Sequence, residues 1–192
     1  FIFVWIFAGI TIPLYLIKKN ENTISHREQI AIKAQRMEEY EIARNQLAVE
    51  VDNYITSVAP KANIDAFLMV DLCWQYGVDI RFVLAQGHVE SHFGTKGTAR
   101  RTNSVFNVGA FDGHSAKRQI KNGYGYAHPD HSVEPYLKLL TNDYLNGKTE
   151  FDLLESFVNA EGQRYASNPK YEKLMQEKYA QVEKHIDEAY YK

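Results

Sequence analysis

The sequence predicts an α+β chain that is mostly helical, with a compact domain preceded by two helical segments of different character. Three observations support this class. An uncharged apolar run opens the chain, and a charged segment free of glycine and proline follows it up to residue 59. The rest alternates helical periodicity with one stretch rich in glycine, asparagine and aromatic residues. The composition, 45% hydrophobic and 24% charged over 192 residues, excludes a disordered or collagen-like chain.

Residues 1–17 carry no charge before Lys18 and Lys19. As a helix this run would span roughly 26 Å, close to the ~30 Å hydrocarbon core of a bilayer. We expect residues 1–19 to form a transmembrane helix or an apolar helix embedded in a protein assembly. A signal-peptide remnant is the competing interpretation, although no small-x-small cleavage site stands out. The lysine pair alone does not fix a membrane topology.

Residues 20–59 are predicted to form one long amphipathic helix, a stalk that ends at Pro60. Its apolar residues recur with three- and four-residue spacing at Ile30, Met37, Tyr40, Leu47, Val51, Tyr54 and Val58. The stripe is narrow. It fits a coiled-coil seam that would make an oligomer through residues 20–58, a helix lying on the next domain, or a solvated spacer.

Residues 60–192 are long enough for one compact core. Helices are expected at 62–76, at 80–92 with Asp79 as its cap and Gly94 closing it, at 132–145 and at 151–159. A last helix is expected to open at Asn168 and Pro169. Between them, residues 95–129 are predicted to form a small lobe of short strands and loops.

Glu90 is the strongest candidate for chemistry, because it lies in the last turn of the predicted helix 80–92. The partial negative charge at a helix C-terminus and nearby apolar side chains both disfavour a second anion. They keep a carboxyl group protonated near neutrality, as a general acid for glycosidic cleavage requires. Taken alone the signal is weak, since such a glutamate is usually a solvated surface residue.

Four strings stand in order along the chain around and after Glu90. They are Leu84-Ala85-Gln86-x-x-x-Glu90-Ser91-x-Phe93-Gly94-Thr95, Thr102-Asn103-Ser104-Val105-Phe106-Asn107-Val108-Gly109, Tyr126 with Ser132-Val133-Glu134-Pro135-Tyr136, and Tyr165-Ala166-Ser167-Asn168-Pro169-Lys170-Tyr171. Together they resemble the glucosaminidase family of peptidoglycan hydrolases (glycoside hydrolase family 73). The resemblance covers roughly residues 50–185. Three positions depart from the family pattern: Phe93 stands for tryptophan, Ser104 for asparagine and Asn107 for glycine.

The resemblance implies a lysozyme-like fold and hydrolysis of the β-1,4 bond between N-acetylglucosamine and N-acetylmuramic acid. It gives Glu90 the position of the family's catalytic acid and Tyr165 the position of its active-site tyrosine. Tyr165 could equally be a tyrosine that packs in the core before a helix cap. The positions that it implies for substrate binding are Ser91, Phe93, Asn103, Phe106, Asn107 and Tyr126. His114 is added as a polar cleft histidine that would contact the sugar, although it also fits a surface position. The expected partner is the glycan strand of peptidoglycan.

A second carboxylate is harder to place. Residues 95–129 hold no glutamate, and Asp112 is their only acid, with Asp130 and Glu134 just beyond. We predict Asp112 as base or water-positioning residue, although an Asp-Gly pair also forms turns. Assistance from the substrate's own 2-acetamido group would remove the need for it.

No cofactor and no metal are expected. Five histidines fall within residues 88–131, and His88 and His92 share a helix face, but Val89 stands where the zinc-protease pattern has its glutamate. The single cysteine, Cys73, excludes a disulfide framework. A net charge of −2 gives no electrostatic case for nucleic acid as a partner.

Two other functions stay open at this point. A muramidase or lytic transglycosylase shares the fold and the Glu-Ser pair at the helix end, but its usual Gly-Leu-Met-Gln-type segment is absent. An inactive wall-binding or structural protein is the second alternative. The apolar segment, the stalk and the wall hydrolase together predict a bacteriolytic enzyme held at the bacterial cell envelope by a membrane anchor, or one associated with a phage virion.

Overall fold

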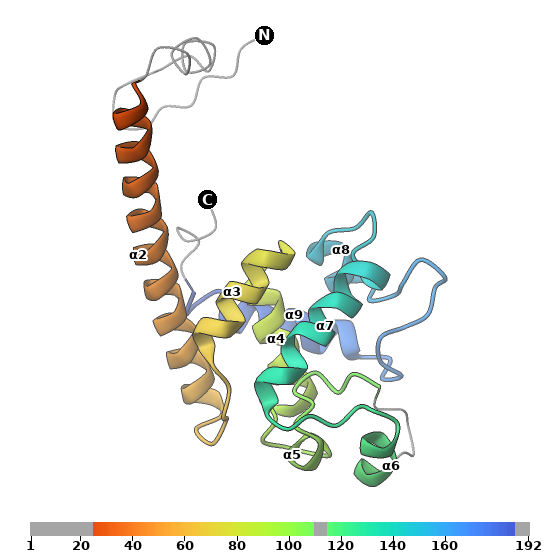
Figure 1. The fold of residues 1–192 in the computed structure, drawn as a ribbon. Helices are drawn as coiled ribbons and strands as arrows, with labels where there is room; N and C mark the ends of the chain where they lie inside the picture. Colours follow the sequence, from red (N-terminus) through yellow and green to blue (C-terminus); the bar gives the residue numbers. More distant parts are fainter. Residues whose placement is uncertain (1–24, 110–114, 187–192) are drawn as a thin grey trace. The chain divides into compact units, whose positions relative to one another are not determined.

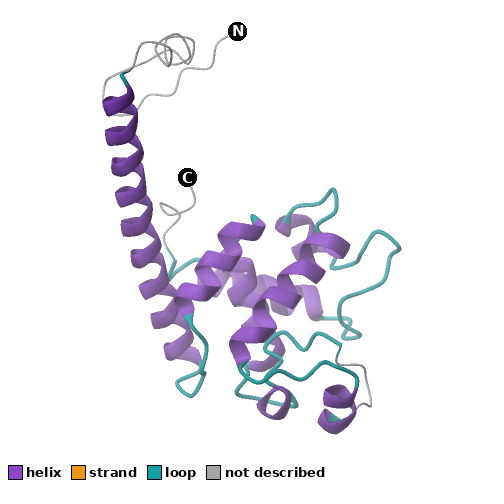
Figure 2. Cartoon of the chain, viewed as in Figure 1, coloured by secondary structure: helices purple, strands orange, loops and turns teal. Residues whose placement is uncertain are grey.

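The computed structural model describes residues 25–109 and 115–186, and every regular element within them is helical (Figures 1 and 2). The α-helices are α2 (His26–Val58), α3 (Ala66–Tyr76), α4 (Ile80–Ser91), α5 (Ala99–Thr102), α6 (Ala116–Lys121), α7 (Val133–Leu139), α8 (Glu150–Glu155) and α9 (Tyr171–Val182). A 3₁₀ turn, η1 (Pro129–Ser132), precedes α7, and a π-helical turn, η2 (Leu140–Tyr144), follows it.

The predicted apolar helix at 1–19 lies outside the described residues. Within the described part, none of the helices is both long enough and apolar enough to cross a bilayer. Within the predicted stalk, residues 26–58 form one continuous helix, α2.

The chain separates into two compact units between Ile42 and Ala43, partway along α2. In the first unit the predicted apolar stripe is exposed, with Ile30 56% and Met37 52% accessible. In the second unit the remainder of α2 is part of the core through Leu47, Ala48, Val51, Tyr54 and Ile55. The compact unit therefore starts earlier than residue 60. The stripe widens at Leu47 to the i, i+1, i+4, i+7, i+8 pattern of a helix that buries one face.

α4 is the central helix of the second unit, and nearly all of its residues are buried. It packs chiefly on α9 and also on α3. As predicted, the Asp79 side chain caps it by accepting a hydrogen bond from the Arg81 backbone N–H at 2.8 Å. The helix that carries Glu90 is thus held on several sides by other helices.

Several predicted helix boundaries differ from the structure. The helix expected at 151–159 is α8, which already ends at Glu155. α3 begins at Ala66 because Asp65 caps it, accepting from the N–H of Phe67 at 2.8 Å. The last helix begins after Lys170, since Asn168 forms a turn ahead of it by accepting from the Lys170 N–H at 2.9 Å. The predicted helix 132–145 is divided into η1, α7 and η2.

The predicted small β lobe is wrong for the described residues, which contain no strand and only one isolated bridge, between Val158 and Arg164. The described parts of residues 95–129 form α5, α6 and turns instead. Asn103 and Asn107 both adopt left-handed backbone conformations, with φ of 52° and 51°. Their left-handed φ values take the chain out of β geometry on both sides of residues 104–106, which form no strand.

Candidate active site

Glu90 lies in the last turn of α4, two residues before a run of three residues with positive φ. His92 (φ 48°) is the left-handed cap, and Phe93 (φ 54°) and Gly94 (φ 82°) follow it. The prediction that Gly94 closes the helix is therefore wrong by two residues. Left-handed non-glycine residues are strained and persist only where packing fixes them. Here the fully buried Phe93 ring packs edge-on against Tyr54, with the ring centroids 6.2 Å apart.

The carboxyl group of Glu90 is held at both oxygens. The Tyr171 hydroxyl donates to Oε1, and the Asn107 side-chain amide donates to Oε2 at 3.0 Å. The same amide also donates to the backbone carbonyl of Glu90 at 2.8 Å. The left-handed conformation of Asn107 thus places one side chain where it fixes both the helix end and the acid.

A buried hydrogen-bond chain leads from α7 to Glu90. The Tyr136 hydroxyl donates to Gln86 Oε1, and Gln86 Nε2 donates to the Tyr171 hydroxyl at 3.2 Å. Tyr171 then donates to Glu90. Because all three partners are buried, this chain fixes the direction of the donor that reaches the carboxyl group.

Burial is the main influence on the pKa of Glu90 and raises it above the ordinary value. The hydrogen bonds from Tyr171 and then Asn107 act in the opposite direction, but burial outweighs them. The side chain nevertheless keeps some solvent exposure. The raised pKa favours the protonated form that a general acid needs, and after the proton has left two donors stabilise the carboxylate.

Several residues predicted for the site lie together at Glu90. The Tyr165 hydroxyl donates to the backbone carbonyl of Phe106 at 2.8 Å, and its ring stacks on that of Tyr171 with centroids 5.9 Å apart. The Phe106 ring stacks on Tyr136 at 3.8 Å. These aromatic rings surround the hydrogen-bond chain and exclude water from it.

Ser91 and Phe93 hold the end of α4 in place. The buried Ser91 hydroxyl donates to the Val105 carbonyl at 2.6 Å and accepts from the Gly94 N–H at 2.7 Å. The side chain of Phe93 has no exposed surface. In this conformation both side chains join the helix end to the segment around Val105, instead of presenting a surface to a sugar.

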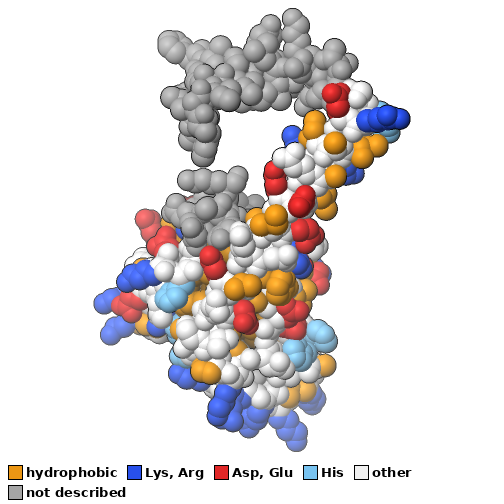
Figure 3. All heavy atoms as spheres, turned by 90° about the vertical axis from the view of Figure 1, so that its left-hand side faces the viewer, with side chains coloured by type: hydrophobic (Ala, Val, Ile, Leu, Met, Phe, Trp, Pro, Cys, Tyr) orange, Lys and Arg blue, Asp and Glu red, His pale blue; other side chains and the backbone are white. Residues whose placement is uncertain are grey.

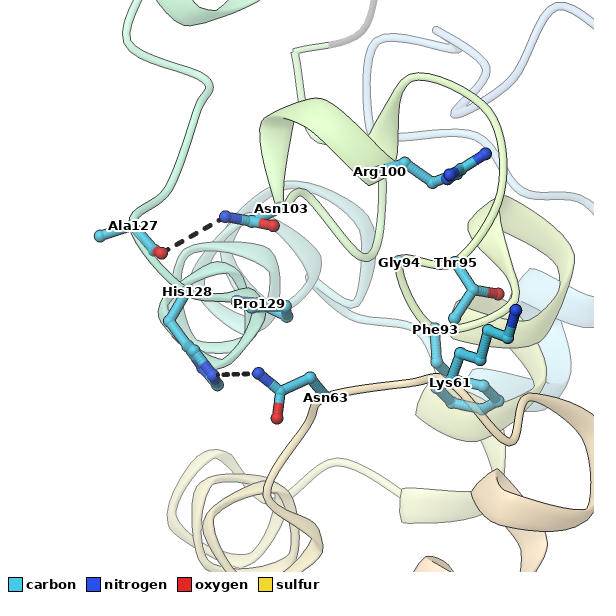
Figure 4. A pocket seen from close by; sticks show the side chains of 10 residues that line it. All are labelled: Lys61, Asn63, Phe93, Gly94, Thr95, Arg100, Asn103, Ala127, His128 and Pro129. Carbon is cyan, nitrogen blue, oxygen red and sulfur yellow. Dashed lines mark hydrogen bonds between the residues drawn. The ribbon is translucent and has the colours of Figure 1, made fainter.

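Asn103 and Tyr126 lie beside each other. The Asn103 amide donates to the Tyr126 carbonyl at 2.9 Å, and the Tyr126 N–H donates to the Thr102 carbonyl at 2.8 Å. Asn103 also borders a pocket of about 540 Å³ (Figure 4). Its lining residues are Lys61, Asn63, Phe93, Gly94, Thr95, Arg100, Asn103, Ala127, His128 and Pro129. Neither hydrogen-bond partner of the Glu90 carboxyl group is among them.

The second carboxylate stays a prediction, because Asp112 and also His114 lie outside the described residues. The two other acids considered have partners elsewhere. Asp130 accepts from the Asp65 N–H at 2.7 Å, and Glu134 accepts from the Tyr76 hydroxyl at 3.0 Å.

No group of three or more His, Cys, Asp or Glu side chains lies close enough to hold a metal ion in the part of the chain that the structure describes. The His88 and His92 rings are 4.7 Å apart. His88 Nδ1 is hydrogen-bonded to the Tyr54 hydroxyl at 2.8 Å. Burial lowers the pKa of His88 to about 4, helped by the charges of Lys178, His92 and Lys96.

Sequence reasoning gave no role to Gln86, Tyr136 or Tyr171, which form the chain to Glu90. A signal for Gln86 was present, since it precedes Glu90 by four residues and so shares its helix face. Tyr136 and Tyr171 come from distant segments, and only the fold brings them to Glu90.

A comparison with protein families agrees with this geometry. Residues 68–184 match the glucosaminidase family, described as mannosyl-glycoprotein endo-beta-N-acetylglucosaminidase. The matched segment contains Glu90, its two donors Tyr171 and Asn107, and the residues Gln86 and Tyr136 of the hydrogen-bond chain. No curated protein and no solved structure gives a significant match.

Proposed function

Because the chain belongs to the glucosaminidase family, we propose that Glu90 is the general acid with which it cleaves peptidoglycan. Family membership makes the chain a glycosidase that degrades peptidoglycan, with activity of the endo-β-N-acetylglucosaminidase type. The proposal adds which bond is cleaved and which residue donates the proton. The bond is the β-1,4 linkage from N-acetylglucosamine to N-acetylmuramic acid, and Glu90 protonates the leaving oxygen.

The observation that carries the proposal is the environment of the Glu90 carboxyl group. Burial raises its pKa, while Tyr171 and Asn107 hold both oxygens. A protonated carboxyl group in a fixed orientation is what donation to a glycosidic oxygen requires. Once the proton has left, the two donors stabilise the anion, so the same contacts favour the transfer.

Other residues complete the proposed mechanism. Tyr165 supports the site by stacking on Tyr171 and bonding to the Phe106 carbonyl. Asp112 is proposed as the second carboxylate, either activating a water or stabilising the charged sugar. If the 2-acetamido group of the substrate takes that role, Asp112→Asn keeps most of the activity.

Removing the acid tests the proposal. Glu90→Gln keeps the size of the side chain and one acceptor but has no transferable proton. We expect the variant to fold normally and to lose clearing of a peptidoglycan suspension by a factor of roughly 10² or more, as for other general acids.

Glu134→Gln is the matched control, since Glu134 bonds to Tyr76 and Lys138 and not to the site. It should clear at the rate of the unmodified chain. Clearing by Glu90→Gln at that same rate contradicts the assignment.

We also propose that the enzyme acts at the bacterial envelope, as a membrane-anchored protein or as part of a phage virion. The support is the uncharged run 1–17 followed by a long helix. Extraction of the full chain from membranes by detergent, and not by salt or alkali, is expected for an anchor. Release by salt alone argues against it.

A further inference from the structure

A basic surface covers the segment between α4 and η1. Residues 91–129 contain six lysines and arginines but one acid, although the whole chain carries a net charge of −2. The six are Lys96, Arg100, Arg101, Lys117, Arg118 and Lys121, and all of them are exposed. Five belong to α5 and α6, which pack together. Figure 3 shows Lys and Arg side chains gathered at the lower end of the second unit. Such clustering produces a local positive field.

The pocket of about 540 Å³ adjoins this surface through Arg100. Its walls come from the α2–α3 connection, the turn after α4, and residues 127–129. Figure 4 shows Lys61 and Arg100 on one side of the pocket, with His128 and Asn63 on the other. The pocket therefore combines two flexible cations with polar groups on the opposite wall.

Among the described residues, no acid pairs with the lysine and the arginine that line the pocket. Lys61 and Arg100 are exposed, and neither forms an ion pair or hydrogen bond with another described residue. Asp130 is the neighbouring acid, and its carboxylate already contacts His128 Nδ1 at 3.0 Å and the Asp65 N–H at 2.7 Å. The pocket thus suits a negatively charged group.

Glu90 and its two donors are not among the residues that line this pocket. Its buried wall residue, Phe93, packs on Tyr54 of α2, whereas Glu90 is bound by Tyr171 of α9 and by Asn107. An anion held by Lys61 and Arg100 would therefore contact a different set of residues from the one that holds the Glu90 carboxyl group. It would be a second contact with the same polymer.

We propose that the pocket and the basic surface bind carboxylate groups of peptidoglycan peptide stems. The proposal rests on the proposed function, because it takes the wall as the substrate. Peptidoglycan carries free carboxylates on its stem peptides at repeated intervals, so one strand offers several at once. Multiple weak ionic contacts hold the enzyme on an insoluble polymer while each contact exchanges quickly.

The test measures co-sedimentation with purified sacculi, using full-length protein in the Glu90→Gln background so that no hydrolysis occurs. Lys61→Gln with Arg100→Gln should weaken binding roughly three- to tenfold at low ionic strength. The difference should disappear in high salt. Lys33→Gln with Arg36→Gln is the matched control, because it removes the same charges from exposed positions of α2.

Two further arms identify the source of the negative charge. Amidation of the stem carboxylates should lower binding of the parent to the level of the pocket variant or below it, because the rest of the basic surface loses its ligands too. Removal of phosphate polymers from the wall should leave binding unchanged. The charge-conserving pair Lys61→Arg with Arg100→Lys should bind like the parent, which separates charge loss from misfolding.

Equal binding by the pocket variant and the α2 control overturns the proposal. So does binding that is lost with phosphate removal but survives amidation. Either result leaves the assignment of Glu90 intact, since that assignment is judged by clearing and not by sedimentation.

Discussion

At the scale of single residues, the acid depends on its hydrogen-bond donors as much as on its own position. Glu90 could be identified from its place at a helix end and from the surrounding strings. The role of Asn107 was expected to be sugar binding, yet its amide binds both the carboxyl group and the carbonyl of Glu90. Its geometry depends on a left-handed φ of 51°, which composition and periodicity do not reveal.

Tyr171→Phe tests the donor to Glu90. The hydrogen bond from Tyr171 lowers the pKa of Glu90, so its loss should raise that pKa further. A general acid is active while protonated, and the alkaline limb of the pH–rate profile should therefore move to higher pH. The maximal rate should fall roughly tenfold or more, since the carboxyl group loses one of its two fixed contacts.

The matched control for that experiment is Tyr179→Phe, on the same helix, whose hydroxyl donates to Asp79 at 3.0 Å. It should leave the alkaline limb in place. If the alkaline limb of the Tyr171→Phe profile stays at the same pH as in the unmodified chain, the Tyr171 hydroxyl does not influence the pKa of Glu90.

At the scale of elements, apolar periodicity predicted the helices, but the sequence pattern of residues 95–129 wrongly predicted short strands. α2, α3 and α4 follow apolar spacing and capping residues, which act locally and can be read from sequence. Val105 and Phe106 are strand-forming types, but Asn103 and Asn107 lie on either side of this run in left-handed conformations. The dense packing around α4 determines those conformations, so local propensity does not predict them.

Gly87→Ala tests that packing at the end of α4. A Cβ at this position would lie 3.0 Å from a Phe93 ring carbon and 3.4 Å from one of Phe106. Overpacking of this kind costs about 1–3 kcal/mol, against a helix-propensity gain of at most about 1 kcal/mol. We expect a net loss of unfolding free energy in urea denaturation.

In a Phe93→Leu background the same substitution should become neutral or stabilising, because the ring that it meets is gone. A double-mutant cycle measures this coupling. Equal effects of Gly87→Ala in both backgrounds would mean that the Phe93 ring does not restrict the space for a methyl group at residue 87.

At the scale of the whole molecule, residues 43–58 of α2 form part of the domain that carries the acid. Tyr54 connects α2 to α4 through its hydrogen bond to His88 and its contact with Phe93. Sequence periodicity predicted the helix but left its partner open, because an amphipathic stripe does not specify what covers it. The wider apolar stripe from Leu47 onward was the signal in the sequence that this part of the helix is buried.

The stability of this unit should depend on His88 between about pH 6.5 and 4. The pKa of His88 is lowered from 6.5 to about 4 in the folded state, so the unfolded chain binds more protons in that window. The contribution of His88 to the unfolding free energy is therefore fully present above pH 6.5 and is lost as the pH drops toward 4. Chemical denaturation at several pH values should show this slope, and His88→Gln should reduce it. An unchanged slope in His88→Gln would assign the pH dependence to other groups.

The most direct test of the central claim is the identity of the reducing ends released from sacculi. Borohydride reduction followed by mass spectrometry distinguishes the two sugars and the anhydro form. The unmodified chain should release N-acetylglucosamine at the reducing end, and Glu90→Gln should release none above background. Muramic acid ends, anhydromuramic acid ends, or equal release by the Glu90→Gln variant would contradict the account.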